Sequence, residues 1–396
     1  MDKLDKAHIV LLDIDRVIDA RGGTEKVFCN MANALVKRGY RVTALCCEPK
    51  KGKPAFNLSP EVHFINAYDQ AQISWKYNKP WNKFWNFSWN KHKRFVNRIT
   101  CKFKKISPCI ESVLQQIPQV DIFITSQPES TFILKECLNQ TVPIVTMFHF
   151  APEKYTNHRD FVVFKNSLEH STSVQVLMPE YEAQIKSCLP NLPVFCIPNV
   201  VPEFSQSACE NKLIINIARL NFQKRPELFV EAYSRIYKDF MTWKCEWWGE
   251  NNLDAEYLNM IKSLIQDKGL QDVITLRGTT DNVEEVLKRA SIFAFPSEYE
   301  GFPLALTEAM SAGLPVVGTK DCCSVNTLIR DGVNGFLTEP TREGFAQALS
   351  QLMENQELRI KLGKQAKEDM KAYSAEVVWG MWDDLIQKVI KEHQSK

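Results

Sequence analysis

The chain has 396 residues, which is long enough for two domains with separate hydrophobic cores. Its formal net charge is +2, and 24% of its residues are charged and 44% hydrophobic. This balance excludes a disordered chain and argues against a generally nucleic-acid-binding protein. Any partner attracted by charge must therefore be recognised by a local patch.

The sequence predicts neither a signal peptide nor a membrane span. No window approaches about 18 uninterrupted apolar residues, and acidic residues flank the short apolar run near the amino terminus. The 12 cysteines include no CxxC pair, and two pairs are adjacent, Cys46–Cys47 and Cys322–Cys323. We therefore expect reduced, mostly buried thiols and a cytoplasmic location.

Short β-type runs alternate with helical patterns through the first half of the chain. We expect strands at His8–Ile14, Arg41–Cys46, Val62–Asn66, Asp121–Thr125, Ile144–Phe148 and Val174–Met178. This alternation predicts a parallel sheet that is covered by helices on both faces.

Paired glycines follow the first of these strands. Gly22 and Gly23 precede a helical pattern, and glycines let the backbone approach a ligand closely at a helix amino terminus. A turn without a ligand is the alternative interpretation. The segment has neither the GxGxxG pattern nor the P-loop lysine, which disfavours simple NAD or ATP sites. Asp13 and Asp15 match a short DxD metal motif, but the match is weak and we expect no metal ligand there.

The segment 71–110 differs most from the rest of the chain. It contains ten Lys or Arg and no Asp or Glu, interleaved with aromatic residues. A helix there would carry one aromatic stripe beside cations, an arrangement typical of insertion at an anionic membrane interface. A core-facing stripe, a groove for a phosphorylated acceptor and single-stranded nucleic acid are the alternatives. The candidate membrane or acceptor contacts are Trp81, Trp85, Trp89, Lys91, Lys93 and Arg94.

His149 follows the strand predicted at Ile144–Phe148. A lone histidine at a strand end is more often a structural residue than a catalyst. The first half ends near Pro198–Cys209, a segment that is rich in turn formers and lacks a helical stripe.

A second series of strands then begins. We expect strands at Lys212–Ala218, Trp243–Trp248, Val273–Leu276, Ser291–Phe295 and Leu314–Val317, with helices such as Pro226–Tyr237 and Leu253–Lys268 between them. Two Rossmann-like domains, 1–200 and 205–374, are the economical solution. The apolar residues of 375–396 recur at helical spacing and predict a last helix.

Two cations follow the first strand of the second half. Arg219 and Lys224 are placed so that they could neutralise a diphosphate leaving group without a metal ion. Cations in a surface loop are otherwise often only solvated.

Two carboxylates stand eight positions apart at a loop-to-helix junction. Glu300 lies in the loop, and Glu308 lies inside a helix that we expect to start with Pro303 as its first residue. The free amides of such a helix start favour an anion, and two carboxylates can accept hydrogen bonds from different hydroxyls of one extended ligand. A glutamate near a helix start can also be no more than a solvated partner of the helix dipole. The backbone expected beside the ligand is that of Gly301, Phe302, Pro303 and Leu304.

The string from Phe295 to Val317 resembles the E-x7-E signature of family-4 glycosyltransferases of the GT-B fold, with Glu300 and Glu308 as its two glutamates. The glycine pair is similar to the family's GGxE loop. Arg219 and Lys224 are similar to its R-x4-K pair, and His149 to the histidine at the end of its corresponding strand. The family includes bacterial lipopolysaccharide and polysaccharide glycosyltransferases.

The resemblance implies an α/β fold of two Rossmann-like parallel-sheet domains facing a central cleft, with the last helix crossing back onto the first domain. It implies a retaining, metal-independent hexosyltransferase that needs no cofactor beyond a UDP- or GDP-sugar and acts on a growing glycan. The basic aromatic segment favours a lipid-linked acceptor and attachment to the inner face of the cytoplasmic membrane. Arg219, Lys224 and the amides near Pro303 would receive the β-phosphate charge. Glu308 would bind the ribose, Glu300 the sugar or the charged anomeric centre, and His149 the sugar.

Two other functions stay open at this point. A sugar-nucleotide isomerase of the same fold would release a new sugar nucleotide without an acceptor. A non-catalytic protein would bind the nucleotide sugar without turnover. The basic aromatic segment argues against the first, and the set formed by Arg219, Lys224, Glu300 and Glu308 argues against the second.

Overall fold

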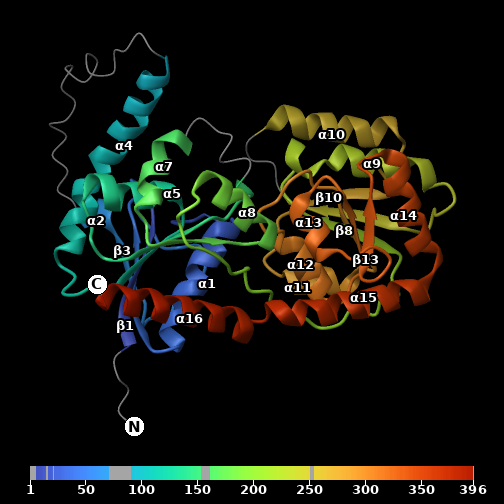
Figure 1. The fold of residues 1–396 in the computed structure, drawn as a ribbon. Helices are drawn as coiled ribbons and strands as arrows, with labels where there is room; N and C mark the ends of the chain where they lie inside the picture. Colours follow the sequence, from blue (N-terminus) through green and yellow to red (C-terminus); the bar gives the residue numbers. More distant parts are fainter. Residues whose placement is uncertain are drawn as a thin grey trace. The chain divides into compact units, whose positions relative to one another are not determined.

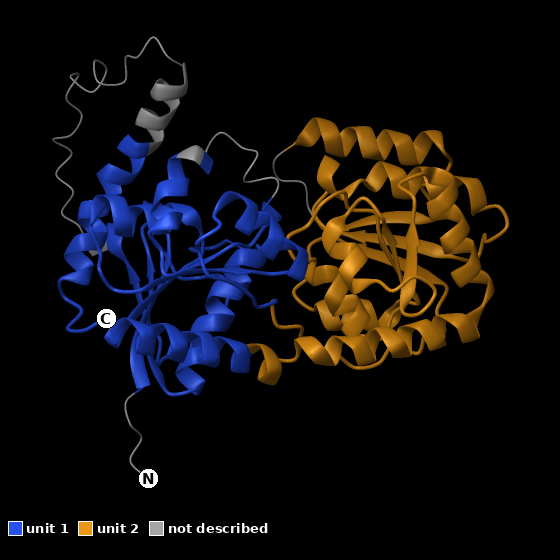
Figure 2. Cartoon of the chain, viewed as in Figure 1, with its two compact units in different colours: residues 1–198, 379–396 blue, residues 199–378 orange. Residues whose placement is uncertain are grey.

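The computed structural model describes residues 6–14, 17–20, 22–70, 91–152, 161–249 and 254–395, without the side chains of 69, 70, 91–99 and 162. The chain forms two compact units, residues 1–198 with 379–396, and residues 199–378 (Figure 2). Each unit contains one parallel sheet with helices on both faces (Figure 1). The expected α/β class with two parallel sheets is confirmed.

The first unit is built on a seven-stranded sheet with the order β3-β2-β1-β4-β5-β6-β7. All its strand pairs are parallel, and Leu12 of β1 lies opposite Leu45 of β2 on one side and Thr125 of β4 on the other. The strands are β1 (Lys6–Asp13), β2 (Tyr40–Cys46), β3 (His63–Asn66), β4 (Ile122–Thr125), β5 (Ile144–Met147), β6 (Ser173–Val176) and β7 (Val194–Cys196).

The helices of the first unit pack on this sheet through apolar side chains. The helices are α1 (Gly23–Lys37), α2 (Ala67–Gln70), α4 (Lys91–Leu114), α5 (Pro128–Phe132), the π-helical turn η2 (Ile133–Cys137), α7 (Phe161–Glu169), α8 (Pro179–Cys188) and the greater part of α16 (Ala375–Gln394). Phe103 of α4 is buried, and its ring lies 5.7 Å from Phe132 and 5.9 Å from Phe164. Phe103, one of the aromatic residues of the basic segment, therefore packs in the core.

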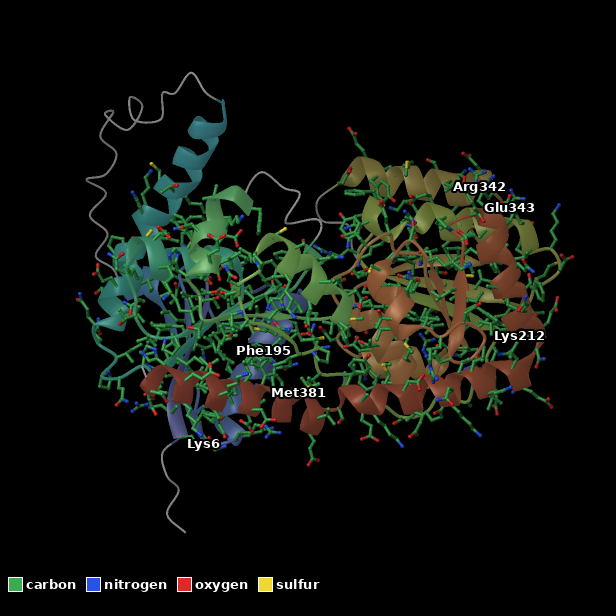
Figure 3. The ribbon with its side chains drawn as sticks, viewed as in Figure 1. Lys6, Phe195, Lys212, Arg342, Glu343 and Met381 are labelled. Atoms are coloured by element: carbon green, nitrogen blue, oxygen red, sulfur yellow. The ribbon has the colours of Figure 1, made fainter. Side chains whose placement is uncertain are left out.

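The end of α16 is anchored within the first unit by two polar contacts. Arg38 forms an ion pair with Asp383 at 2.6 Å. Lys388 Nζ lies 5.0 Å from the centre of the Phe195 ring, which is labelled in Figure 3. The charged face of the helix thus contacts the unit beside its apolar stripe.

The second unit is built on a six-stranded parallel sheet with the order β10-β9-β8-β11-β12-β13. The strands are β8 (Leu213–Ile217), β9 (Lys244–Trp248), β10 (Ile274–Gly278), β11 (Ile292–Phe295), β12 (Val316–Thr319) and β13 (Gly335–Thr338). The helices are η3 (Phe222–Lys224), α9 (Pro226–Ile236), α10 (Ala255–Asp267), α11 (Val283–Arg289), α12 (Leu304–Ser311), α13 (Cys323–Leu328), α14 (Arg342–Glu354), α15 (Gln356–Met370) and η4 (Lys371–Tyr373).

All the predicted strands are present, but two strands at sheet edges were not expected. β7 has three half-buried residues, and β13 has four residues after a glycine-containing turn. The predicted strands of the same length, such as β4 and β5, are fully buried apolar runs, whereas β7 and β13 are partly exposed. They form because a parallel neighbour supplies backbone hydrogen-bond partners.

Candidate functional site

The strand order of the second unit indicates where a ligand can bind. β8 is flanked by β9 on one side and by β11 on the other, so the chain order reverses between β8 and β11. Open α/β sheets bind ligands beyond the carboxyl ends of their strands at such a reversal. The loop after β8 carries Arg219 and Lys224, and the loop after β11 carries Glu300. The topology therefore places these predicted residues at the same edge of the sheet.

The start of the loop after β8 is held against the end of β9. The N–H of Ala218 donates to the carbonyl of Trp248 at 2.8 Å, and its own carbonyl accepts from Trp247 Nε1 at 2.8 Å. Gly249 has a φ of 143°, and a Cβ there would lie 2.0 Å from the Ala218 oxygen. Only glycine permits this approach, so the path of the chain into Arg219 depends on Gly249.

The end of the same loop is the single turn η3, which is tied to the loop after β11. Asn221 caps the turn by accepting a hydrogen bond from the N–H of Lys224 at 3.2 Å. Gln223 Nε2 donates to the carbonyl of Tyr299 at 2.7 Å, and the Gln223 carbonyl accepts from the N–H of Glu298 at 2.9 Å. The two loops are therefore fixed relative to each other by their backbones.

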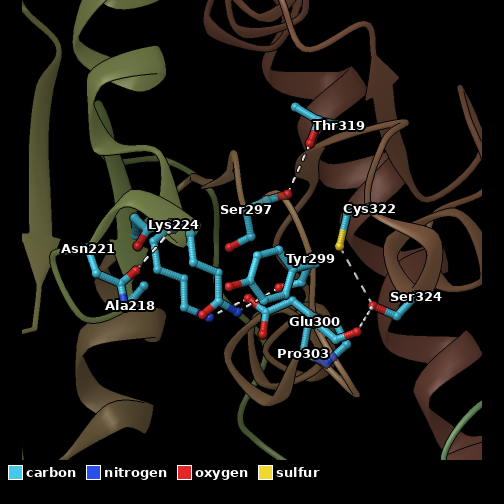
Figure 4. Close-up of polar contacts among 12 residues, drawn as sticks. Ala218, Asn221, Lys224, Ser297, Tyr299, Glu300, Pro303, Thr319, Cys322 and Ser324 are labelled. Atoms are coloured by element: carbon cyan, nitrogen blue, oxygen red, sulfur yellow. Dashed lines mark hydrogen bonds and ion pairs between the residues drawn. The ribbon is translucent and has the colours of Figure 1, made fainter. Parts of the chain in front are cut away.

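Lys224 and Glu300 form an ion pair across these two loops (Figure 4). Only 14% of the lysine side chain and 11% of the glutamate side chain are exposed. The Glu300 carbonyl also accepts a hydrogen bond from Ser324 Oγ at 3.3 Å. A pair so shielded from water interacts more strongly than a surface pair. The fold thus brings together two predicted site residues that are 76 positions apart.

Arg219 occupies a different environment in the same loop. Its side chain is exposed, and no hydrogen bond or ion pair joins it to another residue within the described part of the chain. A guanidinium presents five donors in a fixed fork that suits phosphate oxygens. Arg219 is therefore accessible to an anionic ligand that reaches this edge of the sheet.

The helix after Glu300 begins one residue later than predicted. α12 starts at Leu304, and Pro303 is its N-cap with a φ of −76° and a non-helical ψ of 85°. The prediction that Pro303 is the first helical residue is therefore wrong by one position, because only its φ is helical. Gly301 is half-buried, and the buried Phe302 ring packs 5.7 Å from the Tyr373 ring. Phe302 thus holds the entry to the helix in place.

Glu308 lies inside α12 and is only 5% exposed. It is the fifth residue of the helix, more than one turn from its start. A carboxylate this buried must be satisfied by hydrogen bonds or by a ligand. Its position is compatible with the ribose contact that the resemblance implies.

Arg225 anchors the end of the Lys224 loop, and the sequence analysis did not identify it. Its φ of 46° lies in the left-handed region, which is unusual for a residue with a side chain. Its guanidinium contacts Asp321 Oδ2 at 2.6 Å and Glu298 Oε1 at 3.6 Å. No spacing rule connects Arg225 with Asp321, because the two are 96 positions apart.

A buried carboxylate on β9 was also missed. Glu246 is 7% exposed and accepts hydrogen bonds from Arg277 at 2.7 Å, Arg289 at 3.1 Å and Trp248 Nε1 at 3.0 Å. Burial opposes its ionisation, but these donors and the two positive charges outweigh burial and lower its pKa. The signal in the sequence was a glutamate inside an otherwise apolar strand. The cluster orients Trp248, the residue before Gly249.

In the first unit, the paired glycines lie at the start of α1. Gly22 is the N-cap and Gly23 the first helical residue of α1, which follows β1. β1 lies between β2 and β4, so the strand order reverses here as well. The glycine pair is therefore at the ligand-binding edge of its own sheet.

Glu48 holds the loop that leads to these glycines, and the sequence analysis did not identify it. This buried carboxylate follows β2 and accepts hydrogen bonds from the N–H groups of Val17 at 2.5 Å and Ile18 at 3.0 Å. Asn66 accepts from the N–H of Glu48 at 3.0 Å and donates to its carbonyl at 2.9 Å. The side chains of Glu48 and Asn66 thereby join the loop after β1 to the ends of β2 and β3.

His149 follows β5, as the sequence predicted, and is half-buried. Its Nε2 is fully buried and has no hydrogen-bond partner among the described residues. Burial lowers the pKa of His149 to about 4, so the imidazole is neutral at pH 7. A neutral imidazole with a buried free nitrogen can donate to or accept from a hydroxyl group.

Asp13 ends β1 and is 2% exposed, whereas Asp15 lies outside the described residues. Within those residues, no group of three or more His, Cys, Asp or Glu side chains is arranged to hold a metal ion. No disulfide joins the 12 cysteines, all of which lie among the described residues. Seven of them are buried and one, Cys323, is exposed.

The first half of the basic aromatic segment, 71–90, lies outside the described residues. This applies to Trp81, Trp85 and Trp89; the backbones of Lys91, Lys93 and Arg94 belong to α4, but their side chains are not described. Further along α4, the described cations Lys102, Lys104 and Lys105 are exposed. None of the helices in the described ranges is long and apolar enough to span a bilayer.

Comparison with known proteins adds to this geometry. Residues 201–369 match the family model described as glycosyl transferases group 1. An uncharacterized glycosyltransferase of Haemophilus influenzae is 24% identical over 375 residues, and the match covers 93% of this chain and 97% of that protein. The chain spans between about a fifth and a half of the length of several other curated relatives that it matches.

Two further similarities concern named proteins. The N-acetylgalactosamine-N,N'-diacetylbacillosaminyl-diphospho-undecaprenol 4-alpha-N-acetylgalactosaminyltransferase of Campylobacter jejuni is 30% identical over 167 residues, 42% of this chain and 44% of that protein. A mutant of S. aureus TarM, solved with fondaparinux, alpha-GlcNAc-glycerol and UDP, superposes with a TM-score of 0.76 at 15% identity, covering 96% of this chain and 99% of that one. Residues 201–369 are thus similar to the group 1 glycosyl transferases, and the chain has the GT-B fold of its solved structural neighbours.

Proposed function

We propose that this protein is a retaining, metal-independent glycosyltransferase that moves a hexose from a UDP- or GDP-sugar onto a growing, lipid-linked glycan of a bacterial surface polysaccharide or lipopolysaccharide. The observation that carries the proposal is the joining of Lys224 and Glu300 at the point where the strand order reverses, with Arg219 exposed in the same loop. The two cations at this edge suit the diphosphate of a sugar nucleotide, and the glutamate suits the hydroxyls of its sugar.

The chemistry of the proposal is stabilisation of the leaving group. Negative charge grows on the β-phosphate as the anomeric C–O bond breaks. Arg219, Lys224 and the free amides at the start of α12 receive this charge, and groups already in place for it lower the barrier most. Glu300 binds the sugar or supports the positive anomeric centre, Glu308 binds the ribose, and His149 binds a sugar hydroxyl as a neutral imidazole. Retention of configuration is proposed from the family resemblance alone.

The test is substitution of the two cations. We expect Arg219→Ala and Lys224→Ala each to lower turnover about 10²-fold. Lys212→Ala is the matched control, because Lys212 (labelled in Figure 3) precedes the opposite end of β8. Its ammonium donates to Thr242 Oγ1 at 3.0 Å, and its backbone bond to Lys244 survives the substitution. Full activity and donor affinity in both site variants would refute the diphosphate assignment.

Metal independence and the acceptor need separate experiments. We expect full activity in EDTA; strict rescue by manganese would instead point to Asp13 and Asp15. A lipid-linked acceptor is supported by the name of the Campylobacter jejuni relative and by the exposed cations of α4. Sedimentation with anionic vesicles should fall in a variant with Trp81, Trp85 and Trp89 all changed to Ser, and unchanged binding would reject peripheral attachment through this segment.

A further inference from the structure

The ion pair between Lys224 and Glu300 joins two groups that the proposed reaction uses for different parts of the donor. Lys224 is assigned to the diphosphate and Glu300 to the sugar. In the structure, the carboxylate of one contacts the ammonium of the other (Figure 4). A phosphate that reaches Lys224 therefore meets a carboxylate already in contact with the same cation.

Two anionic groups that share one cation repel each other. The three N–H donors of an ammonium can serve both acceptors, but the repulsion between phosphate and carboxylate weakens the binding of each. The effect is larger at a shielded site than at the surface, and both side chains are less than one-seventh exposed, at 14% and 11%.

The backbone geometry keeps this pair in place. The Lys224 loop is tied to the Glu300 loop through Gln223, at 2.7 Å and 2.9 Å. Arg225 adds contacts to Glu298 and Asp321, at 3.6 Å and 2.6 Å. The loops therefore hold the two charges together, and a ligand separates them by moving side chains only.

We propose that Glu300 makes the site discriminate between the sugar nucleotide and the free nucleoside diphosphate, by competing with the diphosphate for Lys224. The inference rests on the proposed function. A free nucleoside diphosphate takes Lys224 but brings no hydroxyl for the displaced carboxylate. A sugar nucleotide brings both, because its phosphates contact Lys224 and its sugar hydroxyls donate to Glu300. The hydroxyls of the sugar nucleotide therefore compensate Glu300 for the broken ion pair, whereas the free nucleoside diphosphate offers no such compensation.

This selectivity has a consequence for turnover. Release of the product limits the rate of many enzymes. Once the sugar has been transferred, the carboxylate of Glu300 can return to Lys224 and oppose the diphosphate that remains. The same residue would thereby favour binding of the donor and departure of the nucleotide.

The experiment is calorimetric titration of UDP and of GDP into the wild type, Glu300→Gln and Glu298→Gln. We expect Glu300→Gln to bind the preferred nucleotide about five- to tenfold more tightly, which corresponds to about 1–1.4 kcal/mol. Glu298→Gln removes the same charge from the same loop, keeps a side-chain oxygen for Arg225 and leaves the Lys224 contact intact, so its affinity should change less than about twofold. Should Glu300→Gln be poorly folded, Glu300→Asp withdraws the carboxylate by one methylene, and we expect tightening there too.

The possible outcomes separate this inference from the proposed function. Unchanged or weaker binding in Glu300→Gln, or equal tightening in Glu298→Gln, would overturn the competition and leave the diphosphate site intact. Binding of neither UDP nor GDP to the wild type would overturn both. If Lys224→Ala weakens the nucleotide and Glu300→Gln strengthens it, the two residues act in opposition on the same ligand.

Discussion

Gly249→Ala tests how the site depends on the end of β9. The φ of 143° at Gly249 is a conformation that L side chains rarely adopt, and a Cβ there would lie 2.0 Å from the Ala218 oxygen. Holding a residue with a side chain in such a region costs about 1–3 kcal/mol. The carbonyl must also move, which strains the hydrogen bonds of Ala218 to Trp248 and Trp247, both 2.8 Å, at about 0.5 kcal/mol each.

These contributions predict that Gly249→Ala lowers the free energy of unfolding by about 2–4 kcal/mol. In a unit of this size, that corresponds to a fall in Tm of about 5–15 °C. Because Ala218 precedes Arg219, we also expect UDP or GDP to bind more weakly. Urea unfolding and calorimetric titration measure the two effects.

Gly269→Ala is the matched control for this substitution. Gly269 also has a positive φ, 67°, but a Cβ there meets nothing within 4 Å. Only the left-handed backbone is penalised, at about 1–2 kcal/mol, and nucleotide affinity should not change. The reasoning fails if the two variants are equally stable and both bind nucleotide like the wild type.

Three further predictions concern buried polar groups. The pKa of His149 falls from an ordinary 6.5 to about 4 in the folded protein, so its contribution to stability is complete above about pH 6.5 and is lost as the pH drops toward 4. His149→Gln should remove this part of the pH dependence of urea unfolding, and an unchanged pH profile would contradict the prediction. The pKa of Glu246 is lowered in the folded protein, so its contribution to stability is present above the ordinary pKa of 4.5 and is lost as the pH falls through the folded pKa. Urea unfolding should therefore show Glu246→Gln to be less stable by about 1–2 kcal/mol at pH 7 and by progressively less below pH 4.5. Glu48→Ala should destabilise the protein by about 1–3 kcal/mol and speed amide hydrogen exchange at 17–18, whereas Glu48→Gln keeps an acceptor oxygen and should protect these amides. Equal exchange in the two variants would show that the Glu48 side chain does not hold the loop after β1.

Much of the fold could be read from the order of residues because the signals are local. Buried parallel strands are continuous apolar runs, and those at His8–Ile14 and Ser291–Phe295 were identified to within two residues. The edge strands β7 and β13 were missed, because they are not fully buried apolar runs and form strands only beside a neighbour.

For the candidate site too, the sequence predicted the features with local signals, and only the structure showed the others. The sequence by itself determined that Glu300 and Glu308 lie on either side of a helix start, since only a short stretch of chain separates them. Only the tertiary structure decided that Lys224 contacts Glu300, that Arg225 contacts Asp321 and that Glu48 holds the loop before Gly22. These contacts join residues distant in sequence, and the order of strands in each sheet, which no local pattern encodes, determines which loops become neighbours.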